Sequence, residues 1–127
     1  MSQLNAISLD DATKIGNVLK AIANARRLQI LSVIMKNGEA SVGDIDDAIK
    51  DLNQSPISQH LSRLREQGVV QSRKEQQKRI YSISSPEMRD FLEATVFAGS
   101  LSDESLTDVR DAFVVEQDAV IKSAIGE

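Results

Sequence analysis

Residues 55–67 carry polar side chains at helical spacing, and their types suit a hydrogen-bonding partner. A helix brings residues three and four apart onto one face. The apolar face, which we expect to pack on the core, comprises Ile57, Leu61 and Leu64. The opposite face carries Ser55, Gln59, Ser62 and Arg63, with Ser58 and His60 on its flanks. Most surface helices mix acids and bases, whereas the only acid here is Glu66, near the end.

These side chains match the base edges in the major groove of a nucleic-acid duplex. A glutamine can bond adenine through two atoms, a serine can donate or accept, and an arginine reads guanine or holds phosphate. The N-terminus of the helix adds free N–H groups and a positive dipole end. Gln59 therefore suggests an adenine in the recognised sequence. Taken alone, the pattern also fits a solvated helix with ordinary caps.

A basic cluster follows the polar face along the chain. Residues 55–79 contain six basic and two acidic residues, a net charge of +4, whereas the other 102 residues carry −8. The later part of the cluster contributes Arg73, Lys74, Lys78 and Arg79. A basic surface on an acidic chain favours one site for a polyanion, with backbone or minor-groove contacts from these four cations. Chance clustering on a solvated face is the alternative that charge alone leaves open.

Three helices are predicted before this segment. The first, capped by Ser8, has an apolar stripe that is either core or subunit interface: Ile15, Val18, Leu19 and Ile22. The second follows Asn24 and ends at Asn37-Gly38, and its composition makes it central to the core. The third follows Ser41, with Asp44 as the capping-box acid, and its inward residues are Ile45, Ala48, Ile49 and Leu52.

The fourth helix is the polar one, and we expect Asn53 and Gln54 to form the turn before it. Ser55 is then its N-cap, Pro56 occupies its first position and Gly68 ends it.

The period then changes to that of β-strands. Val69-Val70 and residues 80–83 flank a charged stretch, which predicts a hairpin over residues 69–83. Its tip lacks Asn-Gly or Asp-Gly, so we expect a loop longer than two residues. Ser85-Pro86 starts a further helix in the same way as Ser55-Pro56, with a buried stripe of Met88, Phe91, Leu92, Thr95 and Val96. A last helix begins near Ser102, with Leu106, Val109, Phe113, Val120 and Ile121 on its apolar side.

This order of elements predicts a mainly α (α+β) winged helix-turn-helix, with five or six helices and a two-stranded β-hairpin wing. We expect a single domain over residues 1–127. Its core spans about residues 19–98, residues 1–18 serve dimerisation, and residues 99–127 form a C-terminal helical extension.

Composition excludes several classes of function. Cysteine is absent and His60 is the only histidine, so disulfides, thiolate catalysis and a multi-histidine metal site are excluded within one chain. No apolar run could span a bilayer, and the N-terminal residues lack a secretory pattern. We therefore expect a cytoplasmic, nucleoid-associated protein with no membrane contact.

His60 is a poor candidate for catalysis. Ser58 and Ser62 are two residues away and do not face it on a helix, and no acid stands three or four residues away. Packing or contact with phosphate is favoured, and a charge near neutral pH could tune affinity. Without a nucleophile–base pair or a Gly-rich phosphate loop, the chain is predicted not to be an enzyme.

The sequence resembles the ArsR/SmtB family of bacterial and archaeal transcriptional repressors over roughly residues 19–97. "LKAIANARRLQIL" is similar to the family's opening segment, and "SRKEQQKRIYSI" to its wing. "LNQSPISQHLSRLREQGVV" is very like the family's recognition helix, and it carries the matching residues Ser55, Ser58, His60, Leu61, Leu64 and Gly68.

The resemblance implies a homodimer, built from the first and post-wing helices, that binds an inverted repeat in double-stranded DNA. It implies DNA contacts from Gln54, Ser55, Ser58, Gln59 and His60, with backbone contacts from Arg63 and the wing cations. The implied interface takes Ile15, Val18, Leu19 and Ile22 from the first helix, and Phe91, Leu92 and Thr95 from the post-wing helix.

The sequence departs from the metal-sensing members of that family. Ser41 and Gly43 stand where many relatives carry a C-x-C pair, and the post-wing helix has acids but no histidine. We therefore expect no metal site, no cofactor and no metal- or thiol-based regulation, although a hard-cation site of Asp or Glu between subunits stays open. The extension could enlarge the interface or dock a partner protein or ligand.

The predicted function is a sequence-specific, DNA-binding transcriptional regulator, most simply a homodimeric repressor. Helix 55–67 would lie in the major groove and the 69–83 wing on the backbone or minor groove. The alternative is a winged-helix protein-interaction module without specific DNA binding.

Overall fold

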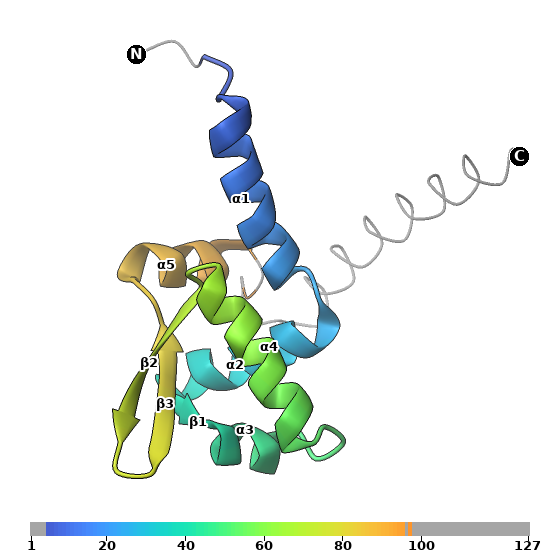
Figure 1. The fold of residues 1–127 in the computed structure, drawn as a ribbon, viewed down its shortest axis with the longest axis vertical. Helices are drawn as coiled ribbons and strands as arrows, with labels where there is room; N and C mark the ends of the chain where they lie inside the picture. The colour runs from blue at the N-terminus through green and yellow to red at the C-terminus, as the bar shows by residue number, and fades with distance from the viewer. Residues whose placement is uncertain (1–4, 96, 98–127) are drawn as a thin grey trace, which may run out of the picture. The chain divides into compact units, whose positions relative to one another are not determined.

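The computed structural model describes residues 5–95 and residue 97. Their elements are α1 (Leu9–Ile22), α2 (Ala25–Asn37), β1 (Ala40–Ser41), α3 (Val42–Ala48), α4 (Gln54–Glu66), β2 (Val70–Glu75), β3 (Lys78–Ile83) and α5 (Pro86–Thr95) (Figure 1). The chain divides into two units inside α5, Met1–Arg89 and Asp90–Glu127. The helix-turn-helix and the wing lie wholly in the first, and the predicted winged helix-turn-helix fold is confirmed.

Side-chain caps start the helices where the sequence placed most of them. Ser8 accepts a hydrogen bond from the backbone N–H of Asp11, and Asn24 accepts one from Arg27. Ser41 and Asp44 form a reciprocal capping box at 3.1 and 3.0 Å. These caps satisfy backbone donors that have no partner within the helix. Gly38, at the C-terminus of α2, has a φ of 85°, a conformation that favours glycine.

The start of α4 differs from the prediction. Asn53, not Ser55, is the N-cap, and the helix begins at Gln54. Pro56 is therefore the third helical residue rather than the first. This position tolerates proline because the first N–H groups of a helix lack an intrahelical acceptor in any case. The helix ends at Glu66, and Gly68 follows with a φ of 75°.

The wing belongs to a three-stranded antiparallel sheet with the strand order β1-β3-β2. The prediction of two strands missed β1, whose Ala40 and Ser41 pair with Tyr81 and Ile80. The prediction of a longer hairpin loop was also wrong, because Glu75 pairs with Lys78 and leaves only two residues between them. Gln76 makes this tight turn by adopting a φ of 58°, which is uncommon for a residue with a side chain.

The core lies where α2, α3 and α4 meet the sheet. Its fully buried side chains are Ile30, Leu31 and Ile34 of α2, Ile45 of α3, Ile57, Leu61 and Leu64 of α4, and Val69 before β2. Burial of large aliphatic side chains is the main favourable term in folding, at about 1.5–3 kcal/mol each. This cluster therefore sets the position of α4.

Three predicted inward residues are exposed. Ala48 lies on the exposed side of α3 near its end, and Phe91 and Thr95 of α5 are exposed while Leu92 is fully buried. Ala48 is the last residue of the short helix α3, where the helical period no longer predicts reliably which side chains face the core. This position accounts for its exposure. Val96, the predicted break at Gly99-Ser100 and the last helix lie outside the described residues.

The capping box makes stability depend on pH. Hydrogen bonds from the backbone and side chain of Ser41 lower the pKa of Asp44 below its usual value of 3.8. A lowered pKa adds stability above the unfolded-state pKa and loses it as pH falls through the folded-state pKa. We expect Asp44→Asn to lower the free energy of unfolding at pH 7, and the deficit to shrink as pH falls below about 4 and to vanish only below the lowered folded-state pKa.

Urea unfolding between pH 7 and pH 3 measures this deficit. Asp47→Asn is the matched control, because Asp47 is an exposed acid of the same helix and makes no capping bond. A deficit that stays constant with pH would contradict the role of the ionised carboxylate.

Candidate nucleic-acid interface

The buried face of α4 fixes the direction of its polar face. Ile57, Leu61 and Leu64 have no exposed area, as the sequence predicted, and α4 contacts α1, α2, α3 and β2. The predicted reading residues Gln54, Ser55, Ser58, Gln59 and Arg63 are exposed on the other side, as is Ser62. Within the described part of the chain, these six side chains make no hydrogen bond. Their donors and acceptors are therefore available to a partner.

The first turn of α4 also presents backbone donors. Its first intrahelical bond runs from the N–H of Ile57 to the carbonyl of Asn53, at 3.2 Å. The Asn53 side chain makes no capping bond, so among the described residues the N–H groups of Gln54 and Ser55 have no acceptor. Free N–H groups at the positive end of a helix favour an anion such as phosphate.

An ion pair holds the turn before α4. The guanidinium of Arg26, in the first turn of α2, donates to both carboxylate oxygens of Asp51 at 3.0 and 2.9 Å. The hydrogen bond from Arg26 is the largest cause that lowers the pKa of Asp51. Two parallel bonds fix orientation as well as distance, so the turn is held to the start of α2.

His60 is half-buried on the flank of α4. Burial is the main cause that lowers its pKa below 6.5, and the positive charges of Arg27 and Arg26 lower it further. The lowered pKa favours the neutral imidazole at pH 7, whose ring nitrogens provide one donor and one acceptor. The midpoint of its titration lies below 6.5 in the free protein.

The register of the hairpin sorts the wing cations onto two faces. Lys74 pairs with Arg79, so both lie on the same face as Ser72 and Tyr81. This face adjoins α4, because Arg65 of α4 donates to the hydroxyl of Ser72 at 3.4 Å. The opposite face carries Arg73, Glu75 and Lys78.

The face next to α4 is basic. Arg65 and Arg79 both donate to the Ser72 hydroxyl, at 3.4 and 3.2 Å, and Lys74 lies beside Arg79. Two guanidinium groups thus meet at one neutral oxygen. Arg65 was not among the predicted contact residues, because only the register of the hairpin brings Arg79 near it.

The opposite face is close to electrically neutral. Arg73 donates to Glu39 at 2.7 and 3.1 Å and to Glu75 at 3.0 Å. These bonds raise the pKa of Arg73, and the bond from Arg73 is the main cause that lowers the pKa of Glu39. The predicted contact residue Arg73 is thus already paired twice, whereas the exposed side chains of Lys74 and Lys78 make no ion pair within the described residues.

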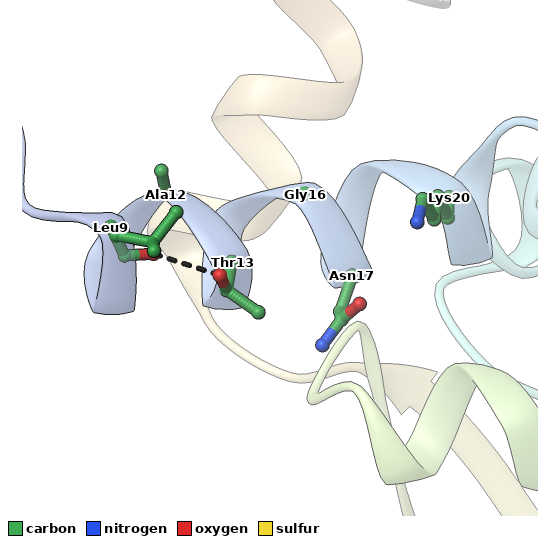
Figure 2. Close-up of a pocket in the computed structure, with 6 residues that line it drawn as sticks. All are labelled: Leu9, Ala12, Thr13, Gly16, Asn17 and Lys20. Atoms are coloured by element: carbon green, nitrogen blue, oxygen red, sulfur yellow. Dashed lines mark hydrogen bonds between the residues drawn. The ribbon is translucent and has the colours of Figure 1, made fainter.

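Helix α1 presents an uncovered apolar surface. Ile15 and Leu19 are 49% and 46% exposed, Val18 is half-buried, and Ile22 is already buried in its own chain. A shallow surface pocket of about 270 Å³ is lined by residues of α1 alone: Leu9, Ala12, Thr13, Gly16, Asn17 and Lys20. Figure 2 shows these residues along the helix. A Cβ atom built at Gly16 would meet nothing within 4 Å.

The predicted interface residues of α5 divide in the same way. Phe91 is 39% exposed and Thr95 is exposed, whereas Leu92 is fully buried. Exposed apolar side chains of this size can serve an interface, and Leu92 serves packing within the chain.

Within residues 5–95 and 97, no helix is long and apolar enough to cross a membrane. The same residues contain no group of three or more His, Cys, Asp or Glu side chains that could hold a metal ion.

The chain is similar to a family of bacterial regulatory proteins. The family described as "Bacterial regulatory protein, arsR family" matches residues 24–72, which run from the cap of α2 into β2. The transcriptional activator HlyU of Vibrio cholerae is 47% identical over 76 residues, covering 60% of this chain and 68% of the relative. The nodulation protein NolR of Rhizobium meliloti is 40% identical over 115 residues, covering 91% and 86%.

A solved structure supplies a fold comparison. The homodimeric winged helix-turn-helix DNA-binding domain from Mycobacterium bovis is 28% identical and superposes with a TM-score of 0.64. The match covers 81% of this chain and 95% of that domain.

The environment of His60 is directly testable, because it is the only histidine. We expect its imidazole to titrate below pH 6.5, and Arg27→Gln to move the midpoint upward by removing a nearby positive charge. Proton NMR of the imidazole ring measures both midpoints. Lys36→Gln, an exposed cation elsewhere on α2, is the control. A midpoint above 6.5 in the unchanged protein would contradict this account.

Proposed function

This chain belongs to the ArsR family of DNA-binding transcriptional regulators, and from that premise we propose that it is a homodimeric repressor that binds an inverted-repeat operator. The family is one of regulators rather than enzymes, as the sequence analysis expected. The observation that carries the proposal is the polar face of α4, whose side chains are exposed and unengaged.

Helix α4 would read bases in the major groove. Gln59 could bond adenine through its carboxamide, and Ser55 and Ser58 could donate or accept at several base edges. Gln54 and the free N–H groups of the first turn would contact backbone phosphate, and neutral His60 would contribute one donor or acceptor. Two such helices in a dimer would read half-sites about one helical turn apart.

The basic face of the hairpin next to α4 would hold the DNA backbone. We assign this role to Arg65, Lys74 and Arg79, with Arg63 at the margin. Lys78 lies on the opposite face of the hairpin and would contact the backbone only from there. Arg73 contributes less, because DNA would have to displace two carboxylates from it.

The exposed residues of α1 and α5 would form the subunit interface. Ile15, Val18 and Leu19 from α1, with Phe91 and Thr95 from α5, offer the apolar area, and the M. bovis domain is described as homodimeric. Small residues at Ala12 and Gly16 would allow close approach of another helix.

Regulation would not involve cysteine, since the chain has none. We propose that it does not involve metal either. Binding to chromosomal DNA would place the protein at the nucleoid in the cytoplasm. Because the Vibrio relative is named an activator, reporter transcription with and without the protein decides the direction of regulation.

The division of the wing into two faces predicts unequal effects of two substitutions. Arg79→Ala should weaken binding to operator and scrambled duplexes alike and reduce the slope of log K against log salt by about 0.9 per lost phosphate contact. Arg73→Ala is the matched control and should leave that slope nearly unchanged.

Fluorescence anisotropy at three salt concentrations measures these slopes, on an operator first selected from genomic DNA with the unchanged protein. Equal slopes for both variants would contradict a backbone contact by the basic face next to α4. If the unchanged protein showed no salt-dependent retention on any DNA, the chain would instead be a protein-interaction module.

The exposed stripe of α1 predicts a dimer-breaking change. Ile15→Glu should yield monomers, because it would bury an unpaired carboxylate in an apolar interface. Sedimentation velocity measures the oligomeric state. Gln29→Glu adds the same charge on the exposed side of α2 and should leave the dimer intact. A monomeric unchanged protein, or an intact Ile15→Glu dimer, would refute this interface.

A further inference from the structure

A second cavity, of about 140 Å³, lies between α1, α2 and the end of α4. Its lining residues are Asn17, Lys20 and Ala21 of α1, Arg27 of α2, Arg63 of α4, and Gln67. Three of these side chains are cationic, two are carboxamides and none is acidic. The lining thus offers many hydrogen-bond donors and no negative charge.

The cations of this cavity are unpaired, unlike their neighbours. The Nε atom of Arg27 is buried without a hydrogen-bond partner, and among the described residues Lys20 and Arg63 make no ion pair. By contrast, Lys14 of α1 pairs with Asp10, and Arg26 of α2 pairs with Asp51. A buried donor without an acceptor is destabilising, so the unpaired guanidinium nitrogen favours the binding of an acceptor.

An ordinary role for these cations is to complement the C-terminus of α4, where the helix dipole is negative. The backbone itself, however, already satisfies the carbonyls of that turn. The N–H groups of Gln67, Val69 and Gly68 donate to the carbonyls of residues 63, 64 and 65, at 3.3, 2.9 and 3.0 Å. No side chain of the cavity donates to them, so the Nε atom of Arg27 remains without an acceptor.

We propose that this cavity binds a small oxyanion of the phosphate class, held by Lys20, Arg27 and Arg63 with help from the amides of Asn17 and Gln67. Guanidinium groups suit the tetrahedral oxygens of phosphate, and an ammonium adds a point charge. The volume lies below the roughly 300–1,000 Å³ of sites for drug-sized ligands, so it fits a phosphate group and not a whole nucleotide. The phosphate belongs either to a free anion or to the DNA backbone.

The position of the cavity would allow a bound anion to change the affinity of the protein for DNA. It joins α1, which carries the proposed interface, to Arg63 on the exposed side of α4. A free anion would engage the Arg63 guanidinium and so reduce its contact with DNA. This effect rests on the proposed function, whereas the binding of phosphate to the free protein does not.

The first experiment titrates the full chain with inorganic phosphate at constant ionic strength, with chloride as the balancing anion. Calorimetry should show saturable binding of one phosphate per chain. Lys20→Gln and Arg27→Gln should each weaken it by about tenfold or more, the size expected for a hydrogen bond to a charged group. Lys36→Gln should leave it unchanged, and circular dichroism confirms that each variant is folded.

His60 reports the same event at the site. Because the charge of Arg27 lowers its pKa, a phosphate bound to Arg27 should raise the NMR midpoint of His60. The control Lys36→Gln should show the same rise. Binding that Lys36→Gln weakens equally, or that leaves His60 unmoved, would mean nonspecific association and overturn the site.

The second experiment separates the two sources of phosphate. If the DNA backbone supplies it, inorganic phosphate will not bind to the free protein, but Lys20→Gln will weaken binding to a random duplex and reduce the salt slope by about 0.9. If a free anion supplies it, the slope of Lys20→Gln will match that of the unchanged protein. If inorganic phosphate does not bind and Lys20→Gln does not change the salt slope, the inference is overturned. The salt slope of Arg79→Ala tests the proposed function independently.

Discussion

Burial of Ile57, Leu61 and Leu64 is the constraint on which the rest of the structure depends. These three side chains have no exposed area, and they fix α4 against α2, α3 and the sheet. Rotation of the helix about its axis would bring aliphatic groups into water, at about 25 cal/mol per Å² of apolar surface. The side chains of α4 that face outward are therefore set by packing, and any partner meets the same arrangement of hydroxyls, carboxamide and guanidinium.

In the wing, strand register determines which side chains face α4 and which face away from it. Alternate side chains point to opposite faces, so the pairing of Lys74 with Arg79 separates the cations next to α4 from Arg73, which two carboxylates engage. The charge of the segment is evenly distributed along the sequence, yet only one face of the hairpin is strongly basic. A one-residue shift in the register of β2 would bring Arg73 to the face next to α4 and move Lys74 to the opposite face, without any change in net charge.

The sequence predicted the fold, the caps at Ser8, Asn24 and Ser41, and the two faces of α4, because these features follow from local periodicity and capping chemistry. It misplaced the start of α4, since Ser55 and Asn53 are both acceptable caps and tertiary packing selects between them. It missed β1, which is too short to carry a pattern, and the tight turn at Gln76, which lacks the usual residues. Arg65 and the unpaired state of Arg27 depend on contacts between elements, and no local signal encodes them.

Ser41 belongs to two parts of the fold at once. It pairs with Ile80 of the wing strand β3, and it is also the N-cap of α3, while the Glu39 carboxylate just before it holds Arg73 of β2. These contacts connect the wing to the helix-turn-helix. The distance between the wing and α4 is therefore fixed within the protein and is the same for each DNA target. Any mismatch between this spacing and straight duplex DNA must be absorbed by bending or twisting of the duplex. The protein would then discriminate among binding sites partly through base pairs that no side chain contacts, because the stiffness of the DNA between α4 and the wing depends on its sequence.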